Sequence, residues 1–146
     1  MMLTIPVTTH TRAELLDITG SVQSALRKLG DRSGACLVYV PHTTAAITVN
    51  ENADPSVGRD ITSVLARLVP AGADYSHSEG NADAHAKAAL VGSSVLIPVE
   101  DGNLVLGTWQ GIFFCEFDGP RNRKVLVKLI AENAGHECRP TPQSQV

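Results

Sequence analysis

The chain has 146 residues, which is the size of one domain, so we expect a single domain over residues 1–146. Its 12 Lys and Arg residues and 15 Asp and Glu residues give a formal net charge of −3, which excludes the basic surface of a nucleic-acid binder or an anionic-membrane binder. Charged residues make up only 18% of the chain, against about 25% in an average soluble domain. We therefore expect other copies of the chain to cover part of the surface.

The N-terminal stretch MMLTIPVTTH carries no cationic residue before its apolar part, and no apolar run approaches the ~18 residues of a membrane span. We expect no membrane association. The three cysteines, Cys36, Cys115 and Cys138, lie far apart and form no CxxC pair, which indicates a reducing, cytoplasmic location. Cys36 and Cys115 lie in apolar runs and are expected to be small core side chains.

The first third of the chain predicts strands over residues 3–9 and 13–18, followed by a helix with Thr19 as its N-cap. Gly30 is expected to end that helix. Residues 34–40 are apolar at both parities, which is typical of a strand covered on two faces.

A strand with β-branched side chains is predicted over residues 43–50, and a strongly amphipathic helix follows it. Asp54 is expected to cap this helix, Pro55 to lie in its first turn and Pro70 to stop it. Its apolar stripe consists of Val57, Ile61, Val64, Leu65 and Leu68.

The second half predicts an Ala-rich helix, capped by Asn81 and running to about Val91, and then a series of strands. The turn Asp101-Gly102 predicts a hairpin, because both residue types tolerate a positive φ. The expected strands cover residues 94–99, 103–106, 109–117 and 124–130. The Pro-containing segment 137–146 is expected to be a loose tail.

The five histidines are the main candidates for chemistry, although His10 and His136, near the ends, are expected to be solvated. His42 shares a strand parity with polar residues up to Asn50, so one face of that strand is polar. A straight strand would place His42 and Asn50 about 26 Å apart. Within one chain, these two residues therefore cannot share one binding site unless the strand bends.

His77 and His85 frame the segment HSEGNADAH, and a loop histidine folded onto a helix can meet one in its first turn. Imidazole nitrogens bind zinc, and His42 as a third ligand would leave a position open for water or substrate. The alternative is that these histidines cap or hydrogen-bond locally. Glu51 and Glu79 are candidate proton-transfer groups or plain surface carboxylates.

Arg121, together with Arg123 and Lys124, follows the turn FDGP, and Lys87 lies on the Ala-rich helix. Such side chains bind phosphate, but a basic cluster after an Asp-containing turn is at least as often ion-paired. Trp109 is either a stacking surface or a core anchor, and we expect the core.

Three blocks of the sequence then produce a resemblance to the YjbQ-type family, often labelled secondary thiamine-phosphate synthase. They are HTTAAITVNENADPSVGRDI, HSEGNADAHAKAALVGSSVLIPV and GNLVLGTWQGIFFCEFDGPR. The resemblance covers about residues 3 to 132, and the combination of GTWQ, EFDGPR and HxEGNAxAHxK is specific to the family.

The resemblance implies a β-rich α+β fold, with an antiparallel, sandwich-like sheet and two or three flanking helices, assembled as a homotrimer. It also implies a polar, histidine-bearing pocket that holds a divalent metal ion, with zinc preferred, at His42, His77 and His85. In this interpretation the substrate-binding residues are Asn50, Lys87, Trp109, Gln110 and Arg121, and Glu51 and Glu79 are the catalytic carboxylates.

The family label implies the joining of a pyrimidine methyl pyrophosphate to a thiazole phosphate. This reaction needs positive charge around the departing pyrophosphate and a wall that stacks the pyrimidine. A histidine-bound metal would equally suit a hydrolase, since magnesium on pyrophosphate is normally held by carboxylates. A non-catalytic trimer that binds a small phosphorylated molecule is the third alternative.

Overall fold

The computed structural model describes residues 1–132, which form eight strands and three helices. His136, Cys138 and the predicted tail lie outside these residues. In chain order the elements are β1 Met2–Thr8, β2 Glu14–Asp17, α1 Thr19–Leu29, β3 Gly34–Tyr39, β4 Ala45–Glu51, α2 Pro55–Leu68, α3 Ala82–Val91, β5 Ser94–Glu100, β6 Asn103–Leu104, β7 Gln110–Glu116 and β8 Asn122–Ala131.

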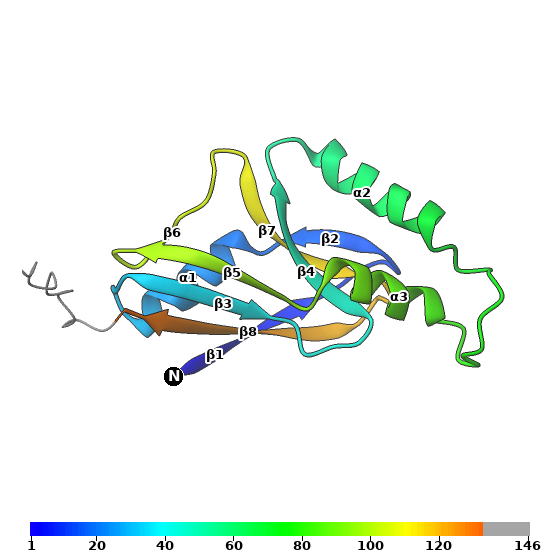
Figure 1. Ribbon diagram of the computed structural model, residues 1–146, viewed down its shortest axis with the longest axis horizontal. Helices are drawn as coiled ribbons and strands as arrows, with labels where there is room; N and C mark the ends of the chain where they lie inside the picture. Colours follow the sequence, from blue (N-terminus) through cyan, green and yellow to red (C-terminus); the bar gives the residue numbers. More distant parts are fainter. Residues whose placement is uncertain (133–146) are drawn as a thin grey trace, which may run out of the picture.

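The strands form two antiparallel sheets (Figure 1). The larger sheet has the order β1-β8-β3-β5-β6, and the smaller has the order β2-β7-β4. α1 packs against β1 and β8, α2 against β2, and α3 against β4. The predicted α+β fold, rich in antiparallel strands and flanked by helices, is confirmed.

The main core lies where the two sheets and α1 meet. It includes Val22 and Leu26 of α1, Val38 of β3, Phe114 of β7 and Val127 of β8, none of which exposes measurable surface. Burial of a side chain of this size stabilises the folded state by about 1.5–3 kcal/mol. The apolar residues of these separate segments therefore hold the two sheets together.

A smaller cluster covers the outer face of the smaller sheet. Cys115 and Phe117 lie there against Ala84 and Ala88 of α3, and Leu65 of α2 packs at its edge. β7 is consequently buried on both faces, as its sequence predicts. Both described cysteines are core side chains, as expected.

Within the single chain, β3 is covered on one face only, so cover of its second face by another copy of the chain stays a prediction. Cys36 and Val38 point into the core, but Tyr39 on the opposite face is 40% exposed. On the same face of the sheet, Leu96 of β5 and Ile130 of β8 are 62% and 49% exposed. In the single chain, the outer face of the larger sheet is therefore open to solvent.

One of the three predicted helix starts needs correction. Thr19 is the first residue of α1 rather than its cap, and its N–H and hydroxyl donate to Asp17 Oδ1 at 2.9 and 2.6 Å. Asn81 is the N-cap residue of α3, as predicted, but its side chain makes no cap hydrogen bond and its Nδ2 donates to Asp118 at 2.9 Å. Asp54 caps α2 as predicted, accepting from the N–H of Ser56 at 2.8 Å.

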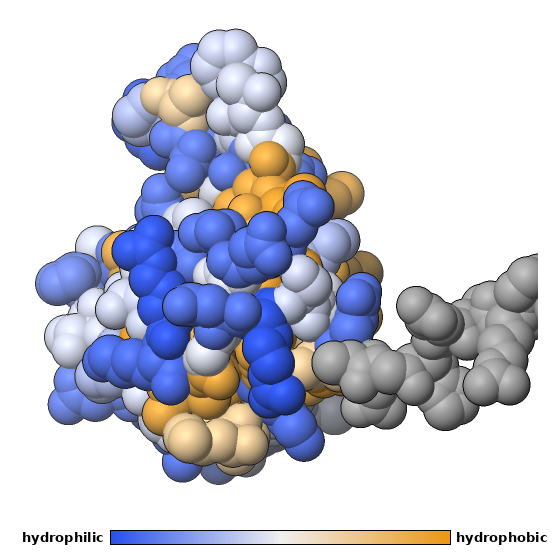
Figure 2. All heavy atoms as spheres, turned by 90° about the vertical axis from the view of Figure 1, so that its left-hand side faces the viewer, coloured by the Kyte–Doolittle hydropathy of each residue, from blue (hydrophilic) through white to orange (hydrophobic). Residues whose placement is uncertain are grey.

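The hairpin between β5 and β6 turns at Asp101 and Gly102, with φ values of 47° and 75°. The predicted turn is confirmed, although β6 is shorter than expected. Figure 2 views the end of the molecule that carries this hairpin, where polar side chains cover most of the surface and apolar groups gather above and below them. No helix in residues 1–132 is long and apolar enough to cross a membrane.

Candidate functional site

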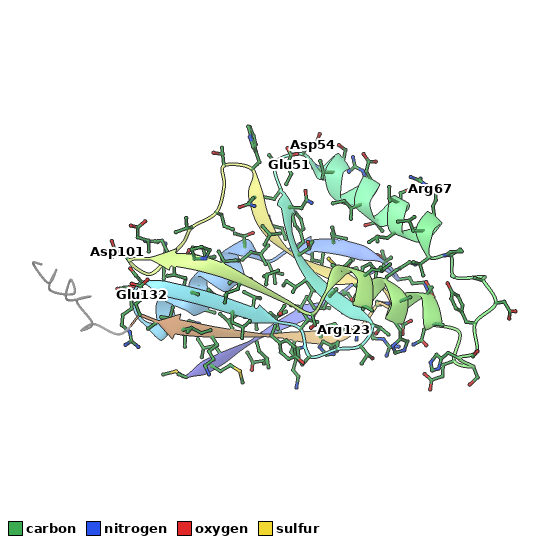
Figure 3. All side chains as sticks on the ribbon, viewed as in Figure 1. Glu51, Asp54, Arg67, Asp101, Arg123 and Glu132 are labelled. Atoms are coloured by element: carbon green, nitrogen blue, oxygen red, sulfur yellow. The ribbon has the colours of Figure 1, made fainter. Side chains whose placement is uncertain are left out.

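The predicted site residues fall at the two ends of β4. His42 precedes the strand, while Asn50 and Glu51 end it, opposite Gly111 and Gln110 of β7. The 7 residues of β4 span about 23 Å at the usual rise per residue. Figure 3 shows Glu51 beside the start of α2, far from Arg123 near the other end of the sheet. His42 and Asn50 therefore do not share a site within one chain, as the strand geometry predicts.

His42 and His85 line one pocket of about 290 Å³. His42 comes from the loop between β3 and β4, and His85 from the first turns of α3. The lining residues are His42, Thr43, Ala45, His85, Ala88, Ala89, Gly92 and Ser93. We call this the histidine pocket. It contains two hydroxyl side chains and no carboxylate.

His77 lies next to His85, as the spacing of the two residues predicts. Their ring centroids are 5.3 Å apart, and the ring planes are nearly perpendicular, at 84°. Glu79 accompanies this pair, with its Oε2 3.6 Å from Nε2 of His77. Both partners of that contact are well exposed, so the contact itself adds little stability.

The ring of His42 is held from β8. Its Nε2 accepts a hydrogen bond of 3.0 Å from the backbone N–H of Lys124. Burial, and then the nearby charge of Arg123, lower the pKa of His42 below its usual 6.5. The imidazole is therefore neutral at neutral pH.

The three histidines predicted to bind a metal ion, His42, His77 and His85, fit that role only in part. His77 and His85 are close enough to act as two ligands. Across residues 1–132, however, no group of three His, Cys, Asp or Glu side chains is arranged to hold a metal. Nε2 of His42 offers no free electron pair, because it accepts from Lys124. The structure therefore does not assemble the expected set of three histidines.

Arg123 forms a buried ion pair with Glu116, a residue that the sequence analysis missed. Its Nε and Nη2 donate to the two carboxylate oxygens at 2.9 and 2.6 Å, and Nη2 also reaches Thr44 Oγ1 at 2.8 Å. Thr9 Oγ1 donates to the same carboxylate at 2.7 Å. The sequence signal for this pair is a single glutamate within the apolar run IFFCEF.

The two basic residues predicted to bind phosphate are both ion-paired. Lys87 Nζ lies 2.8 Å from Asp83, which is 1% exposed and also accepts from Arg12 at 3.0 Å. Arg121 Nη2 lies 2.9 Å from Asp118. These contacts match the ion-paired alternative for the turn, and phosphate binding by Lys87 and Arg121 stays a prediction.

Trp109 is 63% exposed, so the expectation that it anchors the core is wrong. It lies just before β7, and its carbonyl accepts from the N–H of Asn52 at 3.0 Å. The side chain of Gln110 folds back onto the N–H of Gly107 at 2.8 Å. The exposed indole leaves a stacking role open, and substrate binding by Asn50, Trp109 and Gln110 stays a prediction.

A cavity of about 560 Å³ lies between α2 and the edge strand β2, and the sequence does not predict it. Glu51 lines it together with Asp17, Asp54 and Arg59. It contains none of the predicted metal ligands and is separated from the histidine pocket by the length of β4. Glu51 is therefore not placed to transfer protons at the histidines of its own chain.

The Arg123–Glu116 pair gives a prediction about stability. Replacing Arg123 by Met leaves the Glu116 carboxylate buried and uncompensated, so urea unfolding should show a loss of about 3–5 kcal/mol. The control is Arg67→Met, because Arg67 makes only an exposed contact to Ser63 and its loss should change stability by less than about 0.5 kcal/mol. Equal effects of the two changes would contradict the structural role of the pair.

Comparisons with known proteins find a matching family model and closely similar sequences. A family model described as UPF0047 protein YjbQ-like matches residues 3–132. UPF0047 protein MJ1081 of Methanocaldococcus jannaschii is 51% identical, over 90% of this chain and 96% of its own length. UPF0047 protein YugU of Bacillus subtilis is 48% identical, over 89% of this chain and 99% of its own length.

Two solved structures are also similar to this chain in sequence and in fold. A YjbQ/UPF0047-family protein from Clostridium acetobutylicum has 52% sequence identity and a TM-score of 0.85, covering 88% of this chain and 99% of its own. Hypothetical protein APE1520 from Aeropyrum pernix has 42% identity and a TM-score of 0.86, covering 90% and 99%. With a matching family model, closely related sequences and a shared fold, the chain belongs to the UPF0047 YjbQ-like family.

Proposed function

We propose that this protein is an enzyme that acts on a small phosphorylated molecule in the histidine pocket. The observation that carries the proposal is that two histidines from separate elements, His42 and His85, line one pocket. A loop and a helix that are distant in the sequence thus place titratable ring nitrogens around one small volume.

The lining of the pocket favours an anionic ligand. Besides the two imidazoles, it offers the hydroxyl groups of Thr43 and Ser93, and it contains no carboxylate that would repel a phosphate. Hydrogen-bond donors that are fixed in place stabilise charge that develops on oxygen during group transfer. Thiamine-phosphate synthesis, which the resemblance to the family implies, is the first activity to test.

A divalent metal ion, with zinc preferred, belongs to the proposal through His77 and His85. Their adjacent rings would supply two imidazole ligands, and the ion would help to neutralise charge on a departing pyrophosphate. Glu79 lies beside His77 and is the carboxylate best placed to exchange protons there. His42 contributes to the pocket from the other side.

Replacing His85 by Ala removes a side chain common to the pocket and the histidine pair. We expect this change to lower the formation of thiamine phosphate from its two precursors by ~10²-fold or more and to weaken zinc binding in calorimetry. The control is His10→Ala, because His10 is 70% exposed and contacts only Glu14. Full turnover by His85→Ala would contradict the proposal.

The same assay separates the alternative functions. Label from ¹⁸O-water in the phosphorylated product would identify a metal-dependent hydrolase. Retention of a phosphorylated ligand without turnover across a substrate panel would identify a non-catalytic binding protein.

We also propose that the protein assembles as a homotrimer through the open face of the larger sheet, defined by Tyr39, Leu96 and Ile130. These side chains come from three adjacent strands, with Leu96 paired in register to Leu37 and Ile130 to Ala35. Large apolar side chains exposed on one face of a sheet are typical of association sites. Its burial would also account for the low content of charged residues.

Leu96→Glu places a charge on this face, so light scattering coupled to size-exclusion chromatography should show a shift from trimer to monomer. The matched control is Leu90→Glu, because Leu90 is similarly exposed, at 66%, but lies on α3. A trimer that survives Leu96→Glu would exclude this face, and a monomeric wild-type protein would overturn the proposed assembly.

A further inference from the structure

The environment of His42 begins with the end of β3. The last pair between β3 and β8 joins Tyr39 to Leu126, so Lys124 lies two residues beyond the end of β3 on β8. On its other side, β8 pairs Lys124 with Pro6 of β1. The backbone N–H of Lys124 finds its acceptor in the imidazole of His42, with Lys124 N to His42 Nε2 at 3.0 Å. The imidazole thus accepts the hydrogen bond from the Lys124 N–H that a backbone carbonyl would accept inside a sheet.

This contact determines where the ring proton lies. A backbone N–H is always a donor, so Nε2 of His42 must be the unprotonated nitrogen. A neutral imidazole with an unprotonated Nε2 carries its proton on Nδ1. Nδ1 is then a hydrogen-bond donor and has no electron pair for a metal ion, while the electron pair of Nε2 is already in use.

Arg123 and Glu116 hold this arrangement in place. Arg123, adjacent to Lys124, donates through Nη2 to Thr44, two residues after His42. Its guanidinium is fixed in turn by both oxygens of the buried Glu116. The start of β8 therefore binds the loop at two points, the ring of His42 and the hydroxyl of Thr44. We call these contacts the β8 clamp.

We infer that His42 is a neutral Nδ1–H donor that binds an anionic ligand oxygen, such as a phosphate oxygen, in the histidine pocket and does not ligate a metal ion. Nδ1 is the ring nitrogen left for a ligand of the pocket. Arg123 and Glu116 are positioning residues for this donor. The class of ligand rests on the proposed function, whereas the state of the ring rests on the Lys124 contact alone.

The test is ¹H–¹⁵N correlation spectroscopy of the histidine side chains in the wild-type protein at neutral pH. The His42 signals are identified as those lost in His42→Gln. We expect a protonated, pyrrole-type shift for Nδ1 and an unprotonated, pyridine-type shift for Nε2. The reverse pattern, or shifts averaged between the two tautomers, would overturn the inference.

Zinc chloride, which adds no oxyanion, tests the metal role in the same sample. We expect shifts at His77 and His85, with His42 keeping its pattern. A zinc-induced change at a ring nitrogen of His42 would overturn the inference. If zinc shifts no histidine signal, the proposed zinc binding by His77 and His85 is wrong. That result still agrees with His42 not being a metal ligand.

Inorganic phosphate, added without metal, tests the class of ligand. We expect Nδ1 of His42 and its proton to shift on addition. If phosphate leaves them unchanged, the proposed anion contact is wrong, whatever the tautomer.

Thr44→Val tests the β8 clamp, because it removes one acceptor of Arg123 and preserves the shape of the side chain. We expect the His42 ¹⁵N shifts to move toward the tautomer average, while Thr44→Ser, which keeps the hydroxyl, retains the wild-type pattern. Identical His42 spectra for both variants would show that the clamp does not position the ring.

Discussion

The buried ion pair of Glu116 and Arg123 is the interaction on which the candidate site depends. Glu116 exposes no surface, and a buried carboxylate is costly unless its oxygens are paired. Besides Arg123, Thr9 donates to it, as do the backbone N–H groups of Phe117 and Asp118 at 3.1 and 3.2 Å. One carboxylate thus joins the end of β7, the start of β8 and the segment after β1, and through Arg123 it reaches the loop of His42.

The ionisation of Glu116 follows from these contacts. Burial raises the pKa of its carboxyl, but hydrogen bonds from Arg123 and Thr9 lower it, and the net result is a pKa below the usual 4.5. The unfolded state therefore binds the proton more readily. The stabilising contribution is fully present above about pH 4.5 and is lost as the pH falls through the lower pKa of the folded protein. The geometry around His42 is thus maintained at neutral pH.

The sequence predicts a helix start or a turn well where neighbouring residues alone determine it. α2 forms where Asp54 and Pro55 mark its start, and the hairpin turns at Asp101 and Gly102, because capping and positive φ are properties of neighbouring residues. Thr19 does not cap α1, because its hydroxyl donates to Asp17 and its oxygen accepts from the N–H of Ile112 in β7. Trp109 is exposed because it lies in the connection before β7, which a count of apolar residues does not show.

The candidate site is less accessible to sequence reasoning, because its contacts join distant segments. The spacing of His77 and His85 predicts their proximity correctly, and the strand geometry correctly separates His42 from Asn50. The state of the His42 ring depends on where β3 ends beside β8, and this register is a tertiary property. The same holds for Arg123, which forms a fork onto a glutamate in another strand. The residue types alone therefore do not show which side-chain atoms remain available for a ligand.

A crystal structure of the protein with zinc and phosphate, with the metal located by anomalous scattering, tests the central claim most directly. We expect zinc at His77 and His85, a phosphate oxygen on Nδ1 of His42, and an intact contact between His42 Nε2 and the N–H of Lys124. A zinc ion bound to His42, with the Lys124 contact broken, would contradict it.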